Sequence, residues 1–340
     1  MIIPKIKKEV FVMVRFATIG TNWITGDFVT AAKTCRGFEY KAVLSRSEEK
    51  GRDFAERFGA EKVYNDINLM LSDPEIDAVY IASPNSLHAP QAIKCMNAGK
   101  HVLCEKPIAS NEREFLQMLE ASEKNNVTFM EAFKSLLMPG FEVYRNALRK
   151  IGTLRHVFAV FSKYSTRYDA HKRGEALNTF KPEFSNGSLM DLGVYCLYPI
   201  VALFGKPKQI KALAAVIPDG VDGVGTLIMQ YEGFVVTLNY SKVSTSYLPC
   251  EFGGEKGTMT VDKLNIPENV SIIYRDGHRE EFPFTAREDS MCYEAEEFIR
   301  CVENGIKESP VNSHELSMWV IQIMDEARRQ CGVVYPADEV

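Results

Sequence analysis

Residues 14–25 read VRFATIGTNWIT, an apolar run that passes directly through a glycine into a helical pattern. The segment Val14–Ile19 has the length and apolar content of a buried β-strand. A strand, a glycine and a helix in this order place backbone N–H groups where they can bind a pyrophosphate. We therefore expect the first unit of a dinucleotide-binding domain, with Gly37 ending a helix whose apolar residues are Ile24, Phe28, Ala32 and Cys35.

The glycine turn matches the GxGxxG dinucleotide pattern only in part. Gly20 is the first glycine, whereas Asn22 and Thr25 replace the second and the third. Asparagine is the ordinary residue that best tolerates a left-handed backbone, and we expect Asn22 to use that property. Taken alone, the turn fits either a plain strand-to-helix connection or a pyrophosphate site. The residues predicted to form that site are Gly20, Thr21, Asn22, Trp23 and Ile24.

The end of the second predicted strand, Glu39–Ser45, indicates which cofactor the domain prefers. NAD sites usually carry Asp or Glu there, because a carboxylate accepts a hydrogen bond from the ribose 2′-hydroxyl. Here Ser45 and Arg46 end the strand without an acid, and Lys50 follows one turn later. A hydroxyl and a guanidinium suit a 2′-phosphate, which a carboxylate would repel. We therefore predict NADP as the cofactor, with NAD as the alternative.

Strands and helices alternate through the first part of the chain. Such alternation implies parallel βαβ units with right-handed crossovers. We expect a doubly wound, Rossmann-type parallel sheet over residues 13–133, preceded by an extension at residues 1–12. Its further elements are a helix at Ser47–Phe58, a strand at Asp77–Ala82, a helix at Ser86–Asn97, a strand at Lys100–Cys104 and a helix capped by Ser110.

After about Lys150 the pattern changes to successive strands joined by short turns. Turn residues at Tyr231–Phe234 and Gly253–Gly257 indicate hairpins, which favour an antiparallel sheet. We expect an α+β domain over residues 134–340 with a large, mainly antiparallel sheet. Its predicted strands are Leu154–Tyr164, Gln209–Ile217, Gly225–Tyr231, Phe234–Tyr240 and Val270–Tyr274, and its helices are Ser188–Phe204, Asp289–Asn304 and His314–Gln330.

Composition excludes several classes of protein. The 340 residues are 46% hydrophobic and 25% charged, which is typical of a soluble globular protein and not of a disordered or fibrous one. A net charge of −5 without a basic block argues against nucleic acid as a partner. The longest apolar run, Val194–Phe204, is too short to suggest a membrane span. Eight cysteines without a CxxC, and six histidines without metal-ligand spacing, predict free thiols, no bound metal and a cytoplasmic protein.

Two further stretches are similar to one known family. The first is residues 83–88, SPNSLH, followed by residues 98–107, AGKHVLCEKP; the second is residues 187–195, GSLMDLGVY. With the glycine turn, they resemble the Gfo/Idh/MocA family of nicotinamide-dependent oxidoreductases, especially its dimeric dihydrodiol dehydrogenase and glucose–fructose oxidoreductase branch. The resemblance runs from Val14 onward. It implies two domains with the active site in the cleft, and a homodimer or homotetramer built through the open face of the C-terminal sheet.

The resemblance also implies roles for individual residues. Lys106 matches the family's cleft lysine, Tyr195 the position held by Tyr or His, and Asp191 the acid one turn earlier. The residues implied to line the nicotinamide side of the cofactor site are Ser83, Pro84, Asn85, His88, Glu105 and Lys106.

The chemistry of the three motif residues agrees with that assignment. Asp191 and Tyr195 are four residues apart on a predicted helix and so share one face. Alcohol oxidation sends a hydride to nicotinamide and a proton to a base, and carbonyl reduction reverses both transfers. We predict that Tyr195 moves the proton, that Lys106 lowers the tyrosine pKa and contacts the substrate oxygen, and that Asp191 positions them. The alternative is that Lys106 itself moves the proton.

Each residue also has an ordinary structural interpretation: a surface lysine, a core aromatic residue and a first-turn acid. Their co-occurrence with a dinucleotide domain favours an NADP(H)-dependent oxidoreductase acting on a small sugar, polyol or cyclic diol. The alternatives are a non-catalytic NAD(P)-binding sensor or scaffold and a cofactor-free carbohydrate-binding protein. The polar stretch Lys163–His171 is a candidate substrate loop.

Overall fold

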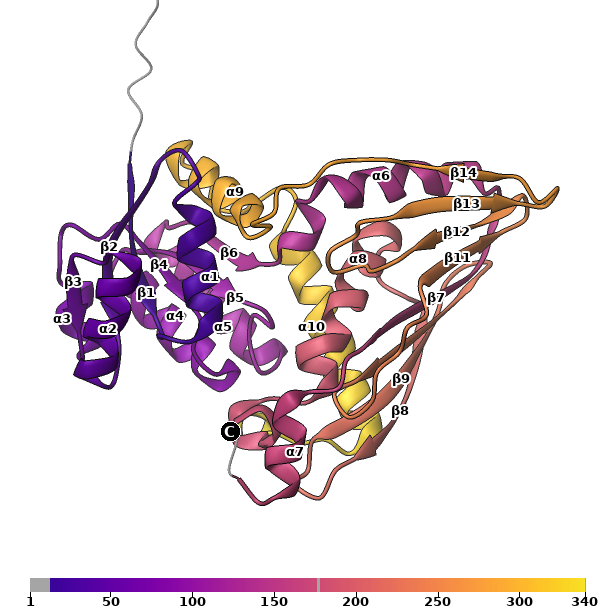
Figure 1. The fold of residues 1–340 in the computed structure, drawn as a ribbon. Helices are drawn as coiled ribbons and strands as arrows, with labels where there is room; N and C mark the ends of the chain where they lie inside the picture. The colour runs from indigo at the N-terminus through magenta and orange to yellow at the C-terminus, as the bar shows by residue number, and fades with distance from the viewer. Residues whose placement is uncertain (1–12, 176–177, 340) are drawn as a thin grey trace, which may run out of the picture.

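The computed structural model describes residues 13–175 and 178–339; the predicted extension at residues 1–12 lies outside this part. Two sheets flanked by helices stand side by side, the first in the N-terminal part and the second in the C-terminal part (Figure 1). This arrangement confirms the predicted combination of a Rossmann-type domain and an α+β domain. The boundary between residues 133 and 134 stays a prediction.

The first sheet has six parallel strands in the order β3-β2-β1-β4-β5-β6. The strand order reverses between β1 and β4, and ligands bind beyond the carboxyl ends of the strands at such a switch point. The strands are β1 (Val14–Ile19), β2 (Phe38–Leu44), β3 (Lys62–Tyr64), β4 (Ala78–Ile81), β5 (His101–Glu105) and β6 (Phe129–Ala132). The helices are α1 (Trp23–Ala32), α2 (Glu48–Phe58), α3 (Ile67–Leu71), α4 (His88–Asn97) and α5 (Glu112–Asn125), with the 3₁₀ turn η1 (Asn85–Leu87) before α4.

The second sheet has eight strands in the order β14-β13-β12-β11-β7-β10-β9-β8, antiparallel except for the pair β7–β10. The strands are β7 (Leu154–Ser162), β8 (Gln209–Val216), β9 (Asp222–Gln230), β10 (Val235–Ser241), β11 (Cys250–Gly254), β12 (Gly257–Val261), β13 (Val270–Tyr274) and β14 (Arg279–Glu281). The helices are α6 (Pro139–Ala147), α7 (Thr166–Lys172), α8 (Val194–Phe204), α9 (Cys292–Glu303) and α10 (His314–Cys331). The shorter turns include η2 (Lys134–Leu136), η4 (Asn178–Phe180), η5 (Pro182–Phe184), the π-helical turn η6 (Leu189–Gly193) and η7 (Pro336–Asp338).

Several local predictions need correction. Helix α1 ends at Ala32 with Lys33 as its C-cap, and does not extend to Gly37. Most of the predicted loop Lys163–His171 is the helix α7. Ser110 does not cap α5, because the side chain of Asn111 accepts the hydrogen bond from the Glu114 N–H at 3.0 Å. The helix predicted from Ser188 begins as the π turn η6 and becomes α-helical only at α8. The strands β3, β6, β11, β12 and β14 were not predicted; their three to five residues include charged residues, threonine or glycine, whereas the equally short β4, β5 and β13 are mostly apolar and were predicted.

Helix α9 joins the two halves of the molecule. It follows the second sheet in sequence but packs on α1 and β1 of the first (Figure 1). The ring of Phe298 lies 5.7 Å from the ring of Phe16 in the same apolar cluster. The α1 side of the first sheet is therefore covered partly by a segment that follows the second sheet in sequence.

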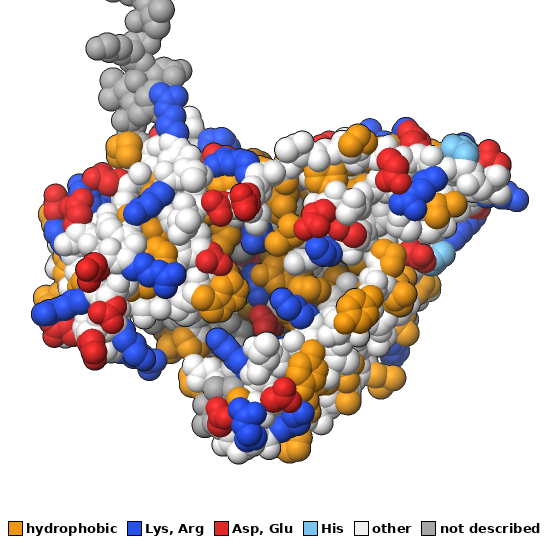
Figure 2. Space-filling view, viewed as in Figure 1, with side chains coloured by type: hydrophobic (Ala, Val, Ile, Leu, Met, Phe, Trp, Pro, Cys, Tyr) orange, Lys and Arg blue, Asp and Glu red, His pale blue; other side chains and the backbone are white. Residues whose placement is uncertain are grey.

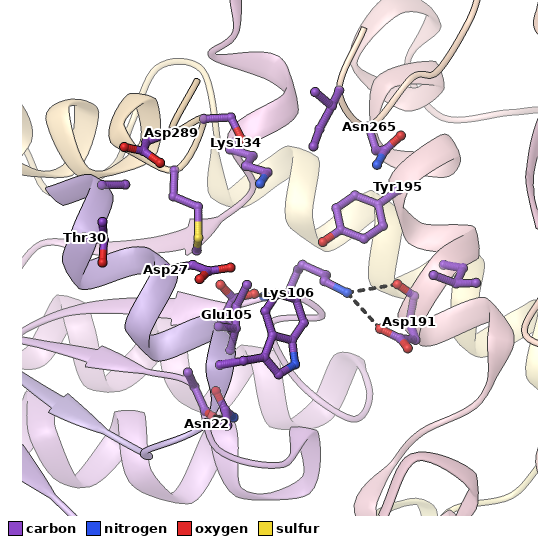
Figure 3. Close-up of a pocket in the computed structure, with 18 of the residues that line it drawn as sticks. Asn22, Asp27, Thr30, Glu105, Lys106, Lys134, Asp191, Tyr195, Asn265 and Asp289 are labelled. Carbon is purple, nitrogen blue, oxygen red and sulfur yellow. Dashed lines mark hydrogen bonds and ion pairs between the residues drawn. The ribbon is translucent and has the colours of Figure 1, made fainter. Parts of the chain in front are cut away.

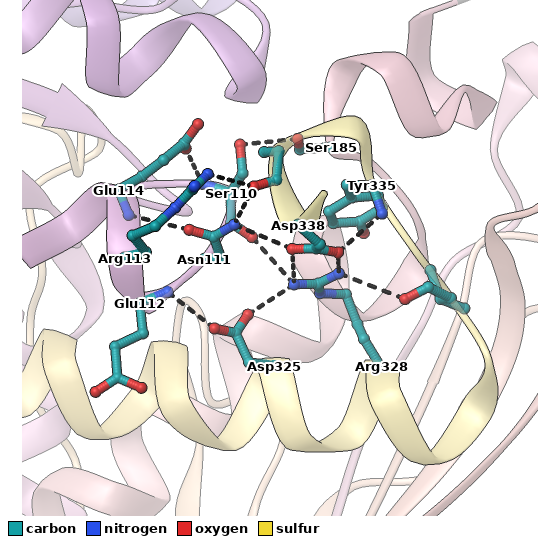
Figure 4. A network of polar contacts seen from close by, with 12 residues as sticks. Ser110, Asn111, Glu112, Arg113, Glu114, Ser185, Asp325, Arg328, Tyr335 and Asp338 are labelled. Atoms are coloured by element: carbon teal, nitrogen blue, oxygen red, sulfur yellow. Dashed lines mark hydrogen bonds and ion pairs between the residues drawn. The ribbon is translucent and has the colours of Figure 1, made fainter. Parts of the chain in front are cut away.

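The C-terminal segment makes a second connection, centred on Arg328 in α10 (Figure 4). The guanidinium is buried, forms ion pairs with Asp325 and Asp338, and donates to the Ser110 carbonyl at 3.3 Å. Its charge also lies 4.1 Å from the centre of the Tyr335 ring. The Tyr335 hydroxyl donates to the Asn186 carbonyl at 2.7 Å, so this network reaches the segment that leads into η6.

The cysteines are free, and all except the half-buried Cys331 are buried, which confirms the prediction of free thiols. Of the described residues, only the segment Pro182–Phe204 is long and apolar enough to cross a membrane by those two criteria. Its most apolar window is 67% buried inside the structure, as in a core helix.

Candidate active site

A cavity of about 650 Å³ opens between the two sheets, and the space-filling view shows the surface hollowed there with charged side chains inside (Figure 2). Its walls come from one side of α1, the ends of β4 and β5, the η6–α8 segment, and the residues just before α9. The volume lies within the usual range for ligand sites.

The glycine turn at one end of this cavity needs glycine for a structural reason. Gly20 has a φ of +111°, and a Cβ there would lie 3.0 Å from the carbonyl oxygen of Ala82. Asn22 does not use a left-handed backbone, contrary to expectation, since its φ is −86°. Instead its side chain caps α1 by accepting from the Thr25 N–H at 3.2 Å, and its amide donates to the Ala82 carbonyl at 3.0 Å. Trp23 and Ile24 line the cavity in the helix's first turn, where backbone N–H groups lack intrahelical partners.

A second cavity of about 390 Å³ lies between α1 and α2 and shares Asn22 and Trp23 with the first. Lys50 lines it, as does Arg57, which the sequence analysis missed. Arg57 is seven residues after Lys50 on the same helix face, and this spacing is the signal that could have found it. Ser45 is buried at the end of β2 and Arg46 is exposed next to it, but neither lines either of these two cavities.

The loop after β4 divides into cavity-lining and supporting residues. Ser83, Asn85 and His88 line the large cavity, whereas Pro84, which begins η1, does not. The His88 ring is buried and hydrogen-bonds the carbonyls of Pro107 (2.9 Å) and Ser83 (3.0 Å). Those contacts fix the loop, and they leave no ring nitrogen for a ligand.

The three motif residues converge on the opposite side of the cavity (Figure 3). The Lys106 ammonium donates to the Asp191 backbone carbonyl at 2.9 Å and to its Oδ1 at 3.1 Å. The same ammonium lies 4.4 Å from the centre of the Tyr195 ring. The tyrosine hydroxyl points between Lys106 and Lys134, and within residues 13–175 and 178–339 it has no hydrogen-bond partner. It is therefore open to a ligand in the cavity.

The protonation states of these groups follow from burial and charge. Burial lowers the pKa of Lys106, but the charges of Tyr195, Asp191 and Glu105 together raise it above the usual value. Desolvation raises the pKa of Asp191, but the charges of two lysines lower it by a larger amount, so the pKa lies well below the usual value. Burial raises the pKa of Tyr195 to about 12, although Lys106 lowers it. The expectation that Lys106 gives Tyr195 a lowered pKa is thus wrong, because desolvation outweighs the neighbouring charge.

Lys242 is the principal residue that the sequence analysis missed. It follows the last residue of β10, and its ammonium lies 2.7 Å from Oδ2 of Asp191. No motif identifies it, since an isolated lysine after a strand is ordinarily a surface charge. Other missed residues that line the cavity include Asp27, Lys134, Phe161, Asn265 and Asp289. Lys163, at the start of the predicted substrate loop, also lines it.

The η6 segment is fixed by the second sheet. Leu189 N–H donates to Oδ2 of the buried Asp222 at 2.7 Å, and the Ser188 hydroxyl donates to the Gly223 carbonyl at 2.6 Å. Gly187 has a φ of +145°, and a Cβ there would lie 2.1 Å from Oδ1 of Asp222. The glycine that begins the second motif therefore allows the close approach that orients Asp191. Within the described residues, no group of three or more His, Cys, Asp or Glu could hold a metal.

Comparison with known proteins agrees with this geometry. A model of an oxidoreductase family with an NAD-binding Rossmann fold matches residues 14–133, and a Gfo/Idh/MocA C-terminal domain model matches residues 147–260. The scyllo-inositol 2-dehydrogenase (NADP(+)) IolU of Bacillus subtilis is 49% identical over 327 residues, covering 96% of this chain and 100% of the relative. The trans-1,2-dihydrobenzene-1,2-diol dehydrogenase of Mus musculus is 30% identical, covering 96% and 99%.

Solved structures show the same fold. KijD10, a 3-ketoreductase from Actinomadura kijaniata solved with NADP and TDP-benzene, has a TM-score of 0.85 at 24% identity, covering 95% of this chain and 99% of that one. The two family models, the sequence relatives and the fold point to one assignment: the chain belongs to the Gfo/Idh/MocA family of oxidoreductases.

Proposed function

We propose that this protein is an NADP(H)-dependent oxidoreductase that transfers a hydride between nicotinamide and a carbinol or carbonyl carbon of a sugar, polyol or cyclic diol. The observation that carries the proposal is the convergence of the Lys106 ammonium, the Asp191 carboxylate and the free Tyr195 hydroxyl in one cavity. The same cavity reaches the glycine turn before α1. The substrate class is supported by the inositol and dihydrodiol dehydrogenases to which the chain is similar.

The residues around the glycine turn fit a dinucleotide. The turn at Gly20 has no room for a side chain, and the first turn of α1 presents N–H groups that suit a pyrophosphate. Ser45, Arg46 and Lys50 would hold the 2′-phosphate, and Arg57 supplies a further positive charge close to Lys50. When bound, the nicotinamide would supply the hydride acceptor or donor.

The remaining chemistry belongs to the chain. Tyr195 is protonated near neutral pH because its pKa is about 12, so its hydroxyl is ready to donate a proton to a developing alkoxide. Lys106 has three N–H donors, of which two bind Asp191, and the third can reach a substrate oxygen. Asp191 stays ionised and holds the lysine in place. In the oxidation direction, Tyr195 accepts the proton, and the rate rises with pH.

Steady-state assays with the purified protein test this proposal. NADPH should be consumed with ketones of cyclic polyols, and NADP⁺ should be reduced with scyllo-inositol or with cyclic diols. Binding of NADPH without any substrate-dependent turnover would instead support a sensor. Absence of any dinucleotide binding, measured by NADPH fluorescence, would support a cofactor-free carbohydrate-binding protein.

We also propose a homodimer or homotetramer built through the open face of the second sheet. Alternate residues of β8, β9 and β10 expose apolar side chains on the face away from α8 and α10, including Leu213, which is 79% exposed. The others are Val216, Val224, Ile228 and Val235. Sedimentation of the wild type and of Leu213→Lys tests the assembly, which the lysine should weaken. A cytoplasmic location stays a prediction.

A further inference from the structure

Asp191 is held by two lysines that come from different domains. Lys106 follows β5 of the first sheet and binds Oδ1, whereas Lys242 follows β10 of the second sheet and binds Oδ2. The Lys242 ammonium also contacts the Thr179 hydroxyl at 2.5 Å and the Thr179 carbonyl at 3.3 Å. The three N–H donors of Lys242 therefore have three partner oxygens, one on Asp191 and two on Thr179.

The burial of Lys242 makes this arrangement informative. Its side chain is only 3% exposed, and its ammonium lies 5.1 Å from the centre of the Phe180 ring. Burying an ammonium costs free energy unless an opposite charge and good hydrogen bonds compensate it. For Lys242, the opposite charge within 4 Å among the described residues is the Asp191 carboxylate. The ion pair with the Asp191 carboxylate therefore compensates the burial of the Lys242 charge.

We propose that Lys242 is a positioning residue for the reaction: it holds the Asp191 carboxylate ionised and oriented, so that Asp191 in turn keeps the Lys106 ammonium beside Tyr195. This inference rests on the proposed function. Two ammonium groups and one carboxylate leave a net positive charge next to Tyr195, which suits a developing alkoxide. Without Lys242, the charges of Asp191 and Lys106 would cancel and leave no net charge next to Tyr195.

The expected consequence is a change in pH dependence. Desolvation raises the pKa of Asp191, and Lys106 and Lys242 are the two charges that oppose it. Lys106 is faced in turn by Tyr195 and Glu105, and Tyr195 by Glu105 and Glu294. Removing Lys242 leaves Asp191 with one opposing charge, so that it binds a proton at a higher pH. A protonated Asp191 no longer holds Lys106 by charge.

The test is the pH profile of kcat for NADPH-dependent carbonyl reduction by the full-length protein. The wild-type kcat should stay flat between about pH 8 and pH 5. Lys242→Met should introduce an acid limb within this range, on which kcat falls by up to about tenfold per pH unit. Lys242→Arg keeps the charge and should restore the flat profile, and Lys242→Gln provides the same test if the Met variant does not fold.

Thr179→Val is the matched control. It removes one hydrogen bond from Lys242 but leaves the ion pair with Asp191, so its profile should stay flat. Equal losses of kcat at pH 5 and pH 8 in both uncharged variants would overturn the inference, because a purely structural role predicts that result. Unchanged kcat in those variants would overturn it as well. Absence of turnover by the wild type overturns the proposed function and this inference together.

Discussion

The sharpest prediction concerns the hydroxyl of Tyr195. The variant Tyr195→Phe keeps the aromatic contacts with Phe133 and Phe161, whose ring centres lie 5.8 and 5.7 Å away, and the Lys106 charge over the ring. Within the described part of the chain the hydroxyl makes no hydrogen bond, so its loss should not lower the free energy of unfolding measurably. The substitution therefore removes one functional group and little else.

The size of the effect follows from general acid–base catalysis. Such a group typically contributes 10²–10⁴-fold, so kcat for carbonyl reduction should fall by at least about 10²-fold, which is about 2.7 kcal/mol in the activation barrier. In the oxidation direction, wild-type kcat should rise with pH because the pKa of Tyr195 is about 12. That rise should disappear in the variant. Both rates are followed by the absorbance of NADPH, and the dissociation constant for NADPH should stay within about twofold.

Tyr198→Phe is the matched control on the same helix. The Tyr198 hydroxyl is buried and hydrogen-bonded to Glu131 at 3.1 Å and to Ser317 at 2.6 Å, away from the cavity. Its loss should lower the free energy of unfolding by about 1–3 kcal/mol while leaving kcat within a few-fold. A Tyr195→Phe variant with near-wild-type kcat, or with an unchanged rise with pH, would refute the assignment and leave Lys106 as the proton carrier.

Three further variants test other parts of the structure. Arg46→Ala should weaken NADPH by roughly tenfold or more while leaving NADH nearly unchanged, in fluorescence titrations at fixed salt; equal losses would remove the 2′-phosphate assignment. Arg328→Met should lower the free energy of unfolding in urea by about 3–5 kcal/mol because it leaves two carboxylates without their ion-pair partner. The control Arg329→Met changes a side chain that is 73% exposed and should lower the free energy of unfolding by at most about 1 kcal/mol. Burial raises the pKa of Asp222 to about 7, so the folded state binds its proton more tightly than the unfolded state does. This proton therefore stabilises the folded wild type at low pH, and the stabilisation is lost as pH rises through about 7. The asparagine of the Asp222→Asn variant does not titrate, so the variant's free energy of unfolding should rise by roughly 4 kcal/mol relative to that of the wild type between about pH 4 and pH 8.

The first sheet was predictable because its long strands and helices carry strong local patterns. Val14–Ile19 is β1 to the residue, and the helix from Ser47 has that serine as its cap and Gly59 as its left-handed stop. Short strands were predictable only where their residues are mostly apolar, as in β4, β5 and β13; the other short strands are specified by their neighbours in the sheet and not by their own residues. The π turn η6 was also hidden, since the sequence of Leu189–Gly193 fits an ordinary helix equally well.

The site divides in the same way. Lys106, Asp191 and Tyr195 were found through motifs, and the geometry brings them together. The direction of the Tyr195 pKa was predicted wrongly, because a sequence gives the neighbouring charge but not the desolvation that opposes it. For Asn22, the residue type suggested a special backbone, whereas the actual role, capping α1, depends on where the Thr25 N–H lies.

Lys242 shows why a residue proposed to act in the site can be visible only in three dimensions. Its place beside Asp191 depends on the register of β10, whose last residue, Ser241, pairs with Ser162 of β7 and Val224 of β9. Successive side chains of a strand point to opposite faces, so a one-residue slip of β10 would send the lysine away from the cleft. The first sheet contributes Lys106 and the second sheet contributes Lys242, and the single carboxylate of Asp191 bridges them. In the proposed mechanism, the charge beside Tyr195 therefore depends on how the two domains meet, so a change at their interface should alter catalysis even when no residue in the cavity is touched.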